Sequence, residues 1–502
     1  MKKIIFLLGF MLFVILGNSQ IDSSLVLWLR ADNLTEDASL WYDITENEYV
    51  ACPIVRDSSL QISRMNFNKS LEIIDGNFFT VLLDDLGTTH AEIIVVYECS
   101  ENFKENGLWN LQVDSNKQVG QSTQQIFNSQ NKIRYDTMNC VVPTINYLTQ
   151  TWDKPSAFSI LQLGKIDTLS FRGKMSEVLC FKTPLQDTLL TQWLSYLAVK
   201  YGVTLVGTDY IDSRERVIWN CIENQDYSYC IAGLGRDDNF GLNQKQTTLA
   251  NSGIILGCGS YSETNEGNTY VLSDGDFVLV GIDSSVVDET IGTNRLGEDC
   301  EVVSRGIVQV TGNWATHKTF LLLDTSKVQI SQAPILCIDR SGQGDFDSLT
   351  TEIYVASCVD SMGHYVYDNV YWDIDRNGKD AFCLVLDSSK VKQIKMEEDG
   401  NVVKMLQSEV QEKLIIHQDK GVIEYCHLFP NPNRGDFKVE VALAEEQNII
   451  LRLYSSDGKL VLEKEEQGHS YYEINGSVQT AGHYLLEITS KGDKKSLKMI
   501  VQ

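Results

Sequence analysis

Short hydrophobic runs separated by glycine, asparagine and acidic residues recur along most of this chain. Such runs, bounded by turn residues, are typical of the strands of β-sandwiches. In the first two hundred residues they lie at 25–32, 91–97, 108–113 and 157–163. Later ones lie at 217–219, 229–232, 253–256, 277–280 and 319–323. We therefore expect an all-β chain made of several β-sandwich domains.

One segment near residue 190 has helical spacing instead. Its apolar side chains recur at the period of one helix face. They are Leu189, Trp193, Leu197 and Tyr201. Thr183 can cap this helix, Pro184 suits its first turn, and Gln186 completes a capping box. Gly202 is a typical helix end. We expect this single helix to close the first domain.

The N-terminus has the pattern of a secretory signal peptide. Two lysines precede an apolar run over residues 4–16, and Gly17 and Ser19 place small residues before a cleavage site at Gln20. The run is short for a membrane span, and no other stretch approaches that length. We assign residues 1–19 to the signal and expect no transmembrane segment in the mature chain.

The last seventy-odd residues carry a series of short motifs. They are Pro430, Asn431, Pro432 and Gly435, then Asp457 and Gly458, then Gly482 and Tyr484, and last the basic tail 494–502. In this order they resemble the type A C-terminal sorting domain of the Bacteroidetes type IX secretion system. The resemblance implies a small separate β-sandwich over 427–502. It also implies handling by the type IX machinery and export to the cell surface or the medium.

The first mature domain, 20–207, has recognisable edges. Residues 27–32, 171–178 and 196–205 resemble the concanavalin A-like (LamG-like) jelly-roll domains of Bacteroidetes surface proteins. The middle, 50–155, carries no motif that can be placed, and a ligand-binding loop would sit there. Five tryptophans offer candidate sugar-stacking faces: Trp28, Trp41, Trp109, Trp152 and Trp193. Apolar patterning favours a core position for Trp28 and Trp193. Trp109 and Trp152 are weak candidates, for which burial is also favoured.

A second β-rich domain is expected over 208–425. Residues 231–238 and 241–245 resemble an uncharacterised β-domain that often follows the LamG-like domain, and that family brings no assigned activity. Gly233 and Gly235 lack the third glycine and the following helix of a phosphate loop. A strand end and turn is the favoured interpretation there.

Charge limits the classes of partner. The formal net charge is −26, from 42 basic and 68 acidic residues. Nucleic acids and anionic membranes are bound through clustered lysine and arginine, so this acidity argues against both. Solubility is the simplest reason for it, while a cation binder or a binder of neutral sugars also fits.

The 12 cysteines are widely scattered and contain no C-x-x-C spacing. An exported protein permits disulfides, yet most of these cysteines lie in apolar runs and are expected as buried free thiols. The pair Cys221 and Cys230 could bridge a hairpin. Zinc is disfavoured because no ligand spacing is present.

One acidic loop is a candidate calcium site. Asp373, Asp375, Asn377 and Asp380 alternate oxygen ligands as calcium loops do, but Leu384 stands where an EF-hand needs glutamate. The favoured alternative is a tight hairpin turn at residues 377–378, with no cofactor.

Catalytic signatures are missing from the sequence. There is no G-x-S-x-G elbow and no Glu-x-Asp-x-x-Glu pattern of jelly-roll glycosidases, and only 7 histidines occur. We expect a non-catalytic protein of adhesion or of carbohydrate or matrix-protein binding. The alternatives are a carbohydrate-active enzyme with an unrecognised carboxylate pair and a structural surface spacer. A groove on the first sandwich lined by aromatics and amides would favour binding, and two facing carboxylates would favour the enzyme.

Overall fold

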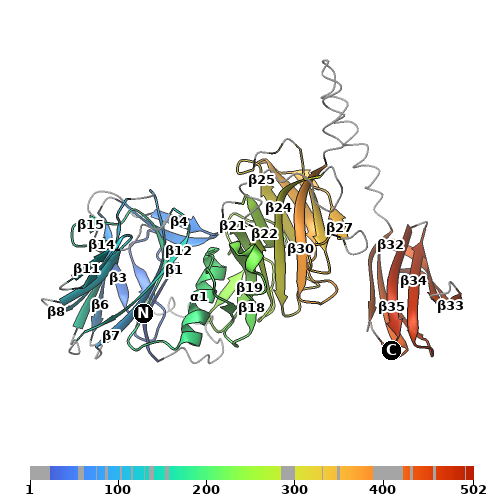
Figure 1. Ribbon diagram of the computed structural model, residues 1–502, viewed down its shortest axis with the longest axis horizontal. Helices are drawn as coiled ribbons and strands as arrows, with labels where there is room; N and C mark the ends of the chain where they lie inside the picture. The colour runs from blue at the N-terminus through green and yellow to red at the C-terminus, as the bar shows by residue number, and fades with distance from the viewer. Residues whose placement is uncertain are drawn as a thin grey trace, which may run out of the picture. The chain divides into compact units, whose positions relative to one another are not determined.

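The regular elements of the computed structural model in Figure 1 are almost all strands. It forms two compact units, residues 1–391 and 392–502. The described residues are 23–54, 61–74, 76–84, 89–101, 104–114, 117–128, 131–134, 141–152, 158–250, 252–283, 300–328, 330, 332–346, 351–387, 422–429, 433–455, 459–491 and 493–501. The predicted signal peptide and the motif residues Pro430, Asn431, Pro432, Asp457 and Gly458 lie outside them. The all-β class with several sandwiches is confirmed.

The first sandwich is a 14-stranded antiparallel arrangement. Its order is β11-β10-β9-β8-β13-β6-β3-β2-β1-β16-β5-β4, and β7 joins β16 to β12. The strands are β1 (Leu25–Leu34), β2 (Trp41–Asp43), β3 (Val50–Ile54), β4 (Gln61–Met65), β5 (Asn68–Ile73), β6 (Phe78–Asp84), β7 (His90–Cys99), β8 (Gly107–Asp114), β9 (Lys117–Ser122), β10 (Gln125–Asn128), β11 (Asn131–Arg134), β12 (Thr144–Thr151), β13 (Phe158–Leu163) and β16 (Gly173–Phe181). A short separate hairpin pairs β14 (Lys165–Ile166) with β15 (Leu169–Ser170).

Three strands of this sandwich are buried on both faces. In β7, Ile93 and Val95 point into the sandwich core, whereas Ile94 and Val96 belong to a second core on the opposite face. Strands β1 and β16 alternate between the same two cores. Burial on both faces explains why these sequences are almost continuously apolar.

The helix α1 (Asp187–Tyr201) covers that outer face. It ends as predicted at Gly202, whose φ of 67° is left-handed and whose N–H bonds to the Ala198 carbonyl. Its start differs from the prediction. Gln186 is the N-cap, without a side-chain cap bond, and Thr183 lies outside the helix. The Leu185 N–H donates to Glu92 (3.2 Å), which ties the preceding segment to the first sandwich.

The second sandwich packs on the other side of α1 (Figure 1). Its seven-stranded sheet has the order β20-β19-β23-β24-β30-β26-β27, and its five-stranded sheet has the order β21-β22-β25-β29-β28. The strands are β19 (Tyr229–Asp237), β20 (Leu242–Gln244), β21 (Gln246–Leu249), β22 (Ile254–Cys258), β23 (Phe277–Ile282), β24 (Cys300–Thr311), β25 (Thr319–Asp324), β26 (Ile335–Asp339), β27 (Thr351–Tyr354), β28 (Cys358–Val359), β29 (His364–Val370) and β30 (Lys379–Asp387). A two-stranded pair, β17 (Tyr210–Ile211) and β18 (Val217–Trp219), and a 3-10 turn η1 (Gln225–Tyr227) precede it.

One hydrophobic core is shared by both sandwiches and the helix. In β23, Val278 and Val280 face the core between the two sheets, while Phe277 and Leu279 face α1. Trp193 of the helix lies against Trp28 of the first sandwich and Phe240 of the second, with ring centroids at 5.0 and 4.5 Å. A continuous core therefore spans the expected domain boundary at residue 207. That boundary stays a prediction.

One local interpretation changes in this sandwich. The segment between β29 and β30 is not a hairpin, because Val370 pairs with Thr319 in the five-stranded sheet and Lys379 pairs with Gln309 in the seven-stranded sheet. It is a crossing between sheets. Gly233 and Gly235 lie within β19 and pair with β23, in agreement with the favoured strand interpretation rather than with a phosphate loop.

The C-terminal unit is a small antiparallel sandwich. Its strands are β31 (Ile423–Phe429), β32 (Asp436–Ser455), β33 (Leu460–Ser477), β34 (Gly482–Ser490) and β35 (Asp493–Val501). The order is β31-β32-β34-β35, and β33 pairs with β32. Strand β31 begins before residue 427, so the end of the expected second domain belongs to this unit. Gly435 has φ 109°, and a Cβ there would lie 2.5 Å from the Val478 carbonyl, while the Tyr484 hydroxyl donates to the Thr480 carbonyl (2.7 Å).

Candidate functional site

A cleft of about 780 Å³, lined mostly by polar and charged residues, opens where the first sandwich, the end of α1 and the second sandwich meet. Strand β1 and the β4–β5 hairpin form one wall. That wall includes Arg30, Asp32, Arg64, Phe67, Asn68 and Lys69. The opposite wall comes from β20 and the segments that follow it. It includes Asn243, Gln244, Lys245, Asn265 and Glu266.

The tip of the β4–β5 hairpin fixes the two walls to each other. Asn66 and Phe67 form its turn with φ of 45° and 67°, a conformation that is common for asparagine and unusual for phenylalanine. Asn66 Nδ2 donates to the Lys200 carbonyl (3.0 Å), and its Oδ1 accepts from the Thr248 N–H (2.9 Å). The Phe67 ring meets Tyr261 edge-on at 6.0 Å and packs on a small apolar cluster of the second sandwich. Docking of this first-sandwich hairpin on α1 and on the second sandwich thus compensates for the strained turn.

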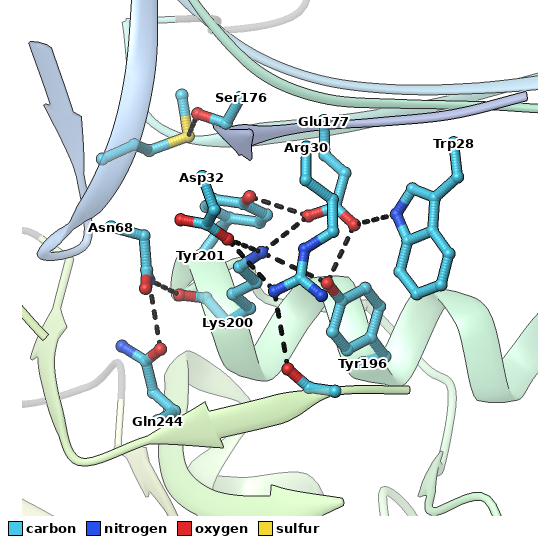
Figure 2. A network of polar contacts seen from close by, with 12 residues as sticks. Trp28, Arg30, Asp32, Asn68, Ser176, Glu177, Tyr196, Lys200, Tyr201 and Gln244 are labelled. Carbon is cyan, nitrogen blue, oxygen red and sulfur yellow. Dashed lines mark hydrogen bonds and ion pairs between the residues drawn. The ribbon is translucent and has the colours of Figure 1, made fainter. Parts of the chain in front are cut away.

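A buried ion network lies beneath the cleft (Figure 2). Glu177 is 0% exposed and accepts four hydrogen bonds. Its Oε1 accepts from Trp28 Nε1 (2.5 Å) and the Tyr196 hydroxyl (2.8 Å), and its Oε2 accepts from the Tyr201 hydroxyl (2.7 Å) and Lys200 Nζ (3.0 Å). Burial raises the pKa of both tyrosines well above the usual range, so their hydroxyls remain donors.

The other half of the network reaches the cleft floor. Lys200 Nζ lies 3.0 Å from Asp32 Oδ2, and Arg30 Nη2 donates to the same oxygen at 3.1 Å. Burial would raise the pKa of Asp32, but the charges of Lys200 and Arg30 outweigh it and lower that pKa to about 2. Arg30 Nη2 also approaches the Gly241 carbonyl of the second sandwich (3.5 Å). Two cations therefore balance two carboxylates.

This network has no group poised to transfer a proton. Glycoside hydrolysis needs a carboxylic acid whose pKa is raised towards neutrality. The pKa of Asp32 is lowered instead, and Glu177 is enclosed by its four donors. The two carboxylates share one ammonium and do not flank an open site. The arrangement suits a rigid binding floor.

Side-chain amides order the cleft walls. Asn68 Nδ2 donates to the Lys200 carbonyl (2.7 Å) and to Gln244 Oε1 (3.1 Å). Asn265 Nδ2 donates to the Asn243 carbonyl (2.8 Å), and its Oδ1 accepts from the Lys245 N–H (2.8 Å). The Asn68–Gln244 bond crosses from the first sandwich to the second, and the other bonds tie each wall to α1 or within itself. The walls are therefore held in place before any ligand arrives.

The tryptophans singled out from the sequence do not form a binding face. Trp109 is 0% exposed, and Trp152 is half-buried against the same core of the first sandwich. Cys221 and Cys230, the pair that could have bridged a hairpin, are both free. The Cys230 thiol instead donates to the Ala250 carbonyl (2.5 Å).

The candidate calcium residues lie together at the crossing from β29 to β30. Asp380 Oδ2 lies 2.9 Å from Arg340 Nη1 and accepts from the Asp373 N–H (2.6 Å). Asn377 Nδ2 donates to the Arg340 carbonyl (2.7 Å) and to Asp375 (3.0 Å). In the part of the chain that the structure describes, no group of three or more His, Cys, Asp or Glu residues is arranged to hold a metal. A guanidinium supplies the positive charge here.

We expect calcium to leave the melting temperature of the mature chain unchanged, because Arg340 already pairs with Asp380. Scanning calorimetry with calcium and with a chelator measures this, since a bound ion would stabilise the fold by mass action. A calcium-dependent rise that is lost in Asp375→Ala, and kept in the exposed control Asp368→Ala, would contradict the expectation.

Comparison with known families places two regions of the chain. Residues 190–375 match a family described as Domain of unknown function (DUF8202), and this match begins inside α1. Residues 427–502 match the Secretion system C-terminal sorting domain. None of the curated proteins matches the chain.

Three solved structures illustrate the likeness to known folds. Domain 4 of AbnA, an extracellular arabinanase from Geobacillus stearothermophilus, is 11% identical with a TM-score of 0.24, over 32% of this chain and 94% of that one. A family 35 carbohydrate binding module from Clostridium thermocellum is 8% identical with a TM-score of 0.17, over 26% and 92%. Dimeric latent PorU from Porphyromonas gingivalis is 13% identical with a TM-score of 0.15, over 88% and 34%. TM-scores this low carry no argument about this chain.

The sorting-domain match decides the destination of the protein. Among the described helices, none has the length and apolarity to cross a bilayer. The chain carries a type IX C-terminal sorting domain at residues 427–502, and it is exported to the cell surface or the extracellular space.

Proposed function

We propose that this exported protein is a non-catalytic binder of a glycan or a matrix protein, and that it binds its ligand in the cleft between the two sandwiches. The observation that carries the proposal is the cleft itself. Two sandwiches meet there, tied by hydrogen bonds of asparagine side chains and by a docked hairpin, with charged and amide groups on both walls. Such a concave site with fixed polar groups is typical of ligand pockets.

The first sandwich supplies half of this site. We propose that it is a LamG-like jelly roll, supported by the resemblance of residues 27–32 and 196–205. Those two segments contain Arg30, Asp32 and Lys200, which lie at the cleft floor. Binding at the cell surface through such a site would serve adhesion. The alternatives are an enzyme and a spacer. The enzyme is disfavoured because Asp32 and Glu177 are both ion-paired, which suits neither proton transfer nor nucleophilic attack.

The test is binding of the full mature chain to glycan and matrix-protein arrays, followed by calorimetry on each hit. Asn243→Trp should lower affinity at least about tenfold, because the new ring would fill the cleft from an exposed position of its wall. The matched control is Ile222→Trp, at a residue that is 77% exposed and does not line the cleft.

Two results would count against the proposal. One is a ligand whose binding is unaffected by Asn243→Trp, which would place the site elsewhere. The other is product release from a polysaccharide that is lost in Asp32→Asn, which would establish the enzyme instead.

A further inference from the structure

The cleft has the opposite charge balance to the rest of the chain. The whole sequence has 42 basic and 68 acidic residues. The lining of the cleft has five basic side chains and two acidic ones, Asp32 and Glu266. The basic ones are Arg30, Arg64, Lys69, Lys200 and Lys245. A concave basic surface on an acidic protein concentrates anions.

Two of these cations are neutralised by buried carboxylates beneath the cleft. Arg30 and Lys200 belong to the buried network with Asp32 and Glu177. The charges that remain for a ligand are those of Arg64, Lys69 and Lys245.

Arg64 and Lys69 are direct cross-strand partners in the β4–β5 hairpin. Directly opposed residues of antiparallel strands lie on the same face of the sheet, and like charges there repel each other. Arg64 has one ion pair, to Glu263 at 3.5 Å, and both side chains are more than half exposed. Pairs of that kind contribute almost nothing to stability. The hairpin therefore holds two adjacent positive charges that an anion between them would stabilise.

Lys245 presents a third charge on the opposite wall. It is 9% exposed, and its ammonium donates to the Asn268 carbonyl. No carboxylate of the described residues lies within ion-pair distance of it. Burial lowers the pKa of Lys245, and the opposing effect of the Glu266 charge does not outweigh it. An ammonium has three N–H donors, so donors remain for a ligand.

We propose that the ligand of the cleft is an acidic saccharide, whose carboxylate or sulfate groups bind Arg64, Lys69 and Lys245. This inference rests on the proposed function and names its ligand class. The cations stand on both walls, and the fixed amides of Asn68 and Asn265 line the same cleft. Charged groups spaced along a hydroxyl-rich chain match that pattern, because hydroxyls suit the polar walls and the acidic groups suit the cations.

The experiment is calorimetric titration of the full mature chain with oligogalacturonate, sulfated dextran, uncharged dextran and poly-glutamate. One or both acidic saccharides should bind, and their affinity should fall as salt rises from about 50 to 500 mM, because ionic strength screens exposed charges. Lys69→Gln should weaken binding about tenfold, since it removes a charged hydrogen bond. Lys327→Gln, at an exposed lysine outside the cleft, should change nothing.

Lys245→Met should also weaken binding of the acidic saccharides, as Lys69→Gln does. Lys69 is half-exposed on the hairpin, so its variant keeps the test valid if the Lys245 variant fails to fold. Uncharged dextran bound as tightly as the acidic saccharides, and blocked by Asn243→Trp, would overturn the charge inference and leave the binding site standing. Preferential binding of poly-glutamate would overturn the saccharide class. Binding of none of these probes, together with empty arrays, would overturn both proposals.

Discussion

Deleting residues 494–502 should reduce surface display of the protein to background and leave it in the periplasm. Strand β35 pairs with β34 along its whole length, from Ser490 opposite Asp493 to Gly482 opposite Val501. Its Met499 is fully buried in the core of the sorting domain. The deletion would open the edge of β34 and remove part of that core, so the sorting domain should not fold. Cell fractionation with protease accessibility measures the outcome.

Point variants separate folding from recognition of the tail. Met499→Ala should cost the sorting domain about 2–5 kcal/mol, as large-to-small changes in cores do, and should lower display with it. Lys495→Gln changes an exposed charge of the same strand and should be displayed normally if the fold is what the machinery needs. Normal display of the truncated chain would show that β35 is dispensable for export.

The strand pattern was predictable because period and turn residues are local properties. The apolar runs at 91–97, 108–113 and 277–280 lie in β7, β8 and β23. The end of α1 was also predictable, since Gly202 adopts the left-handed conformation that glycine permits. The helix start was not. The hydrogen bond from the Leu185 N–H to Glu92 fixes the segment before the helix, and those residues are 93 positions apart in the sequence.

The cleft could not be found by motif, because its contacts join distant segments. Asn66 and Thr248 are 182 positions apart, and Asn68 and Gln244 are 176 apart. One signal was present. Glu177 and Lys200 are charged residues within otherwise apolar runs, and a charge in such a run has to be paired inside the fold. The hairpin interpretation of residues 377–378 failed for the converse reason: a local turn signal says nothing about which sheet each neighbouring strand joins.

Replacing Lys200 by methionine should lower the free energy of unfolding of the mature chain by about 3–5 kcal/mol, which is the usual cost of leaving one partner of a buried ion pair uncompensated. Lys200 is 4% exposed and Glu177 is 0% exposed, so water cannot take over the lost charge. Three hydrogen bonds to Glu177 would remain, from Trp28, Tyr196 and Tyr201, but none brings a positive charge. Chemical denaturation followed by tryptophan fluorescence measures the loss. Lys327→Met, at an exposed position, is the control.

Two further measurements tie this loss to the network. In Lys200→Met/Glu177→Gln the buried charge is gone, so the double variant should lose less than the sum of the two single changes. The acid limb of the curve of unfolding free energy against pH should move as well. The pKa of Asp32 is lowered to about 2 by Lys200 and Arg30, against the effect of burial. A lowered pKa stabilises the fold at pH above the unfolded value, and this contribution is lost as pH falls through the folded value. Without Lys200 the pKa of Asp32 should rise, so the contribution should disappear at a higher pH. A loss below about 1 kcal/mol with an unmoved acid limb would mean that the network does not hold the junction on which the cleft depends.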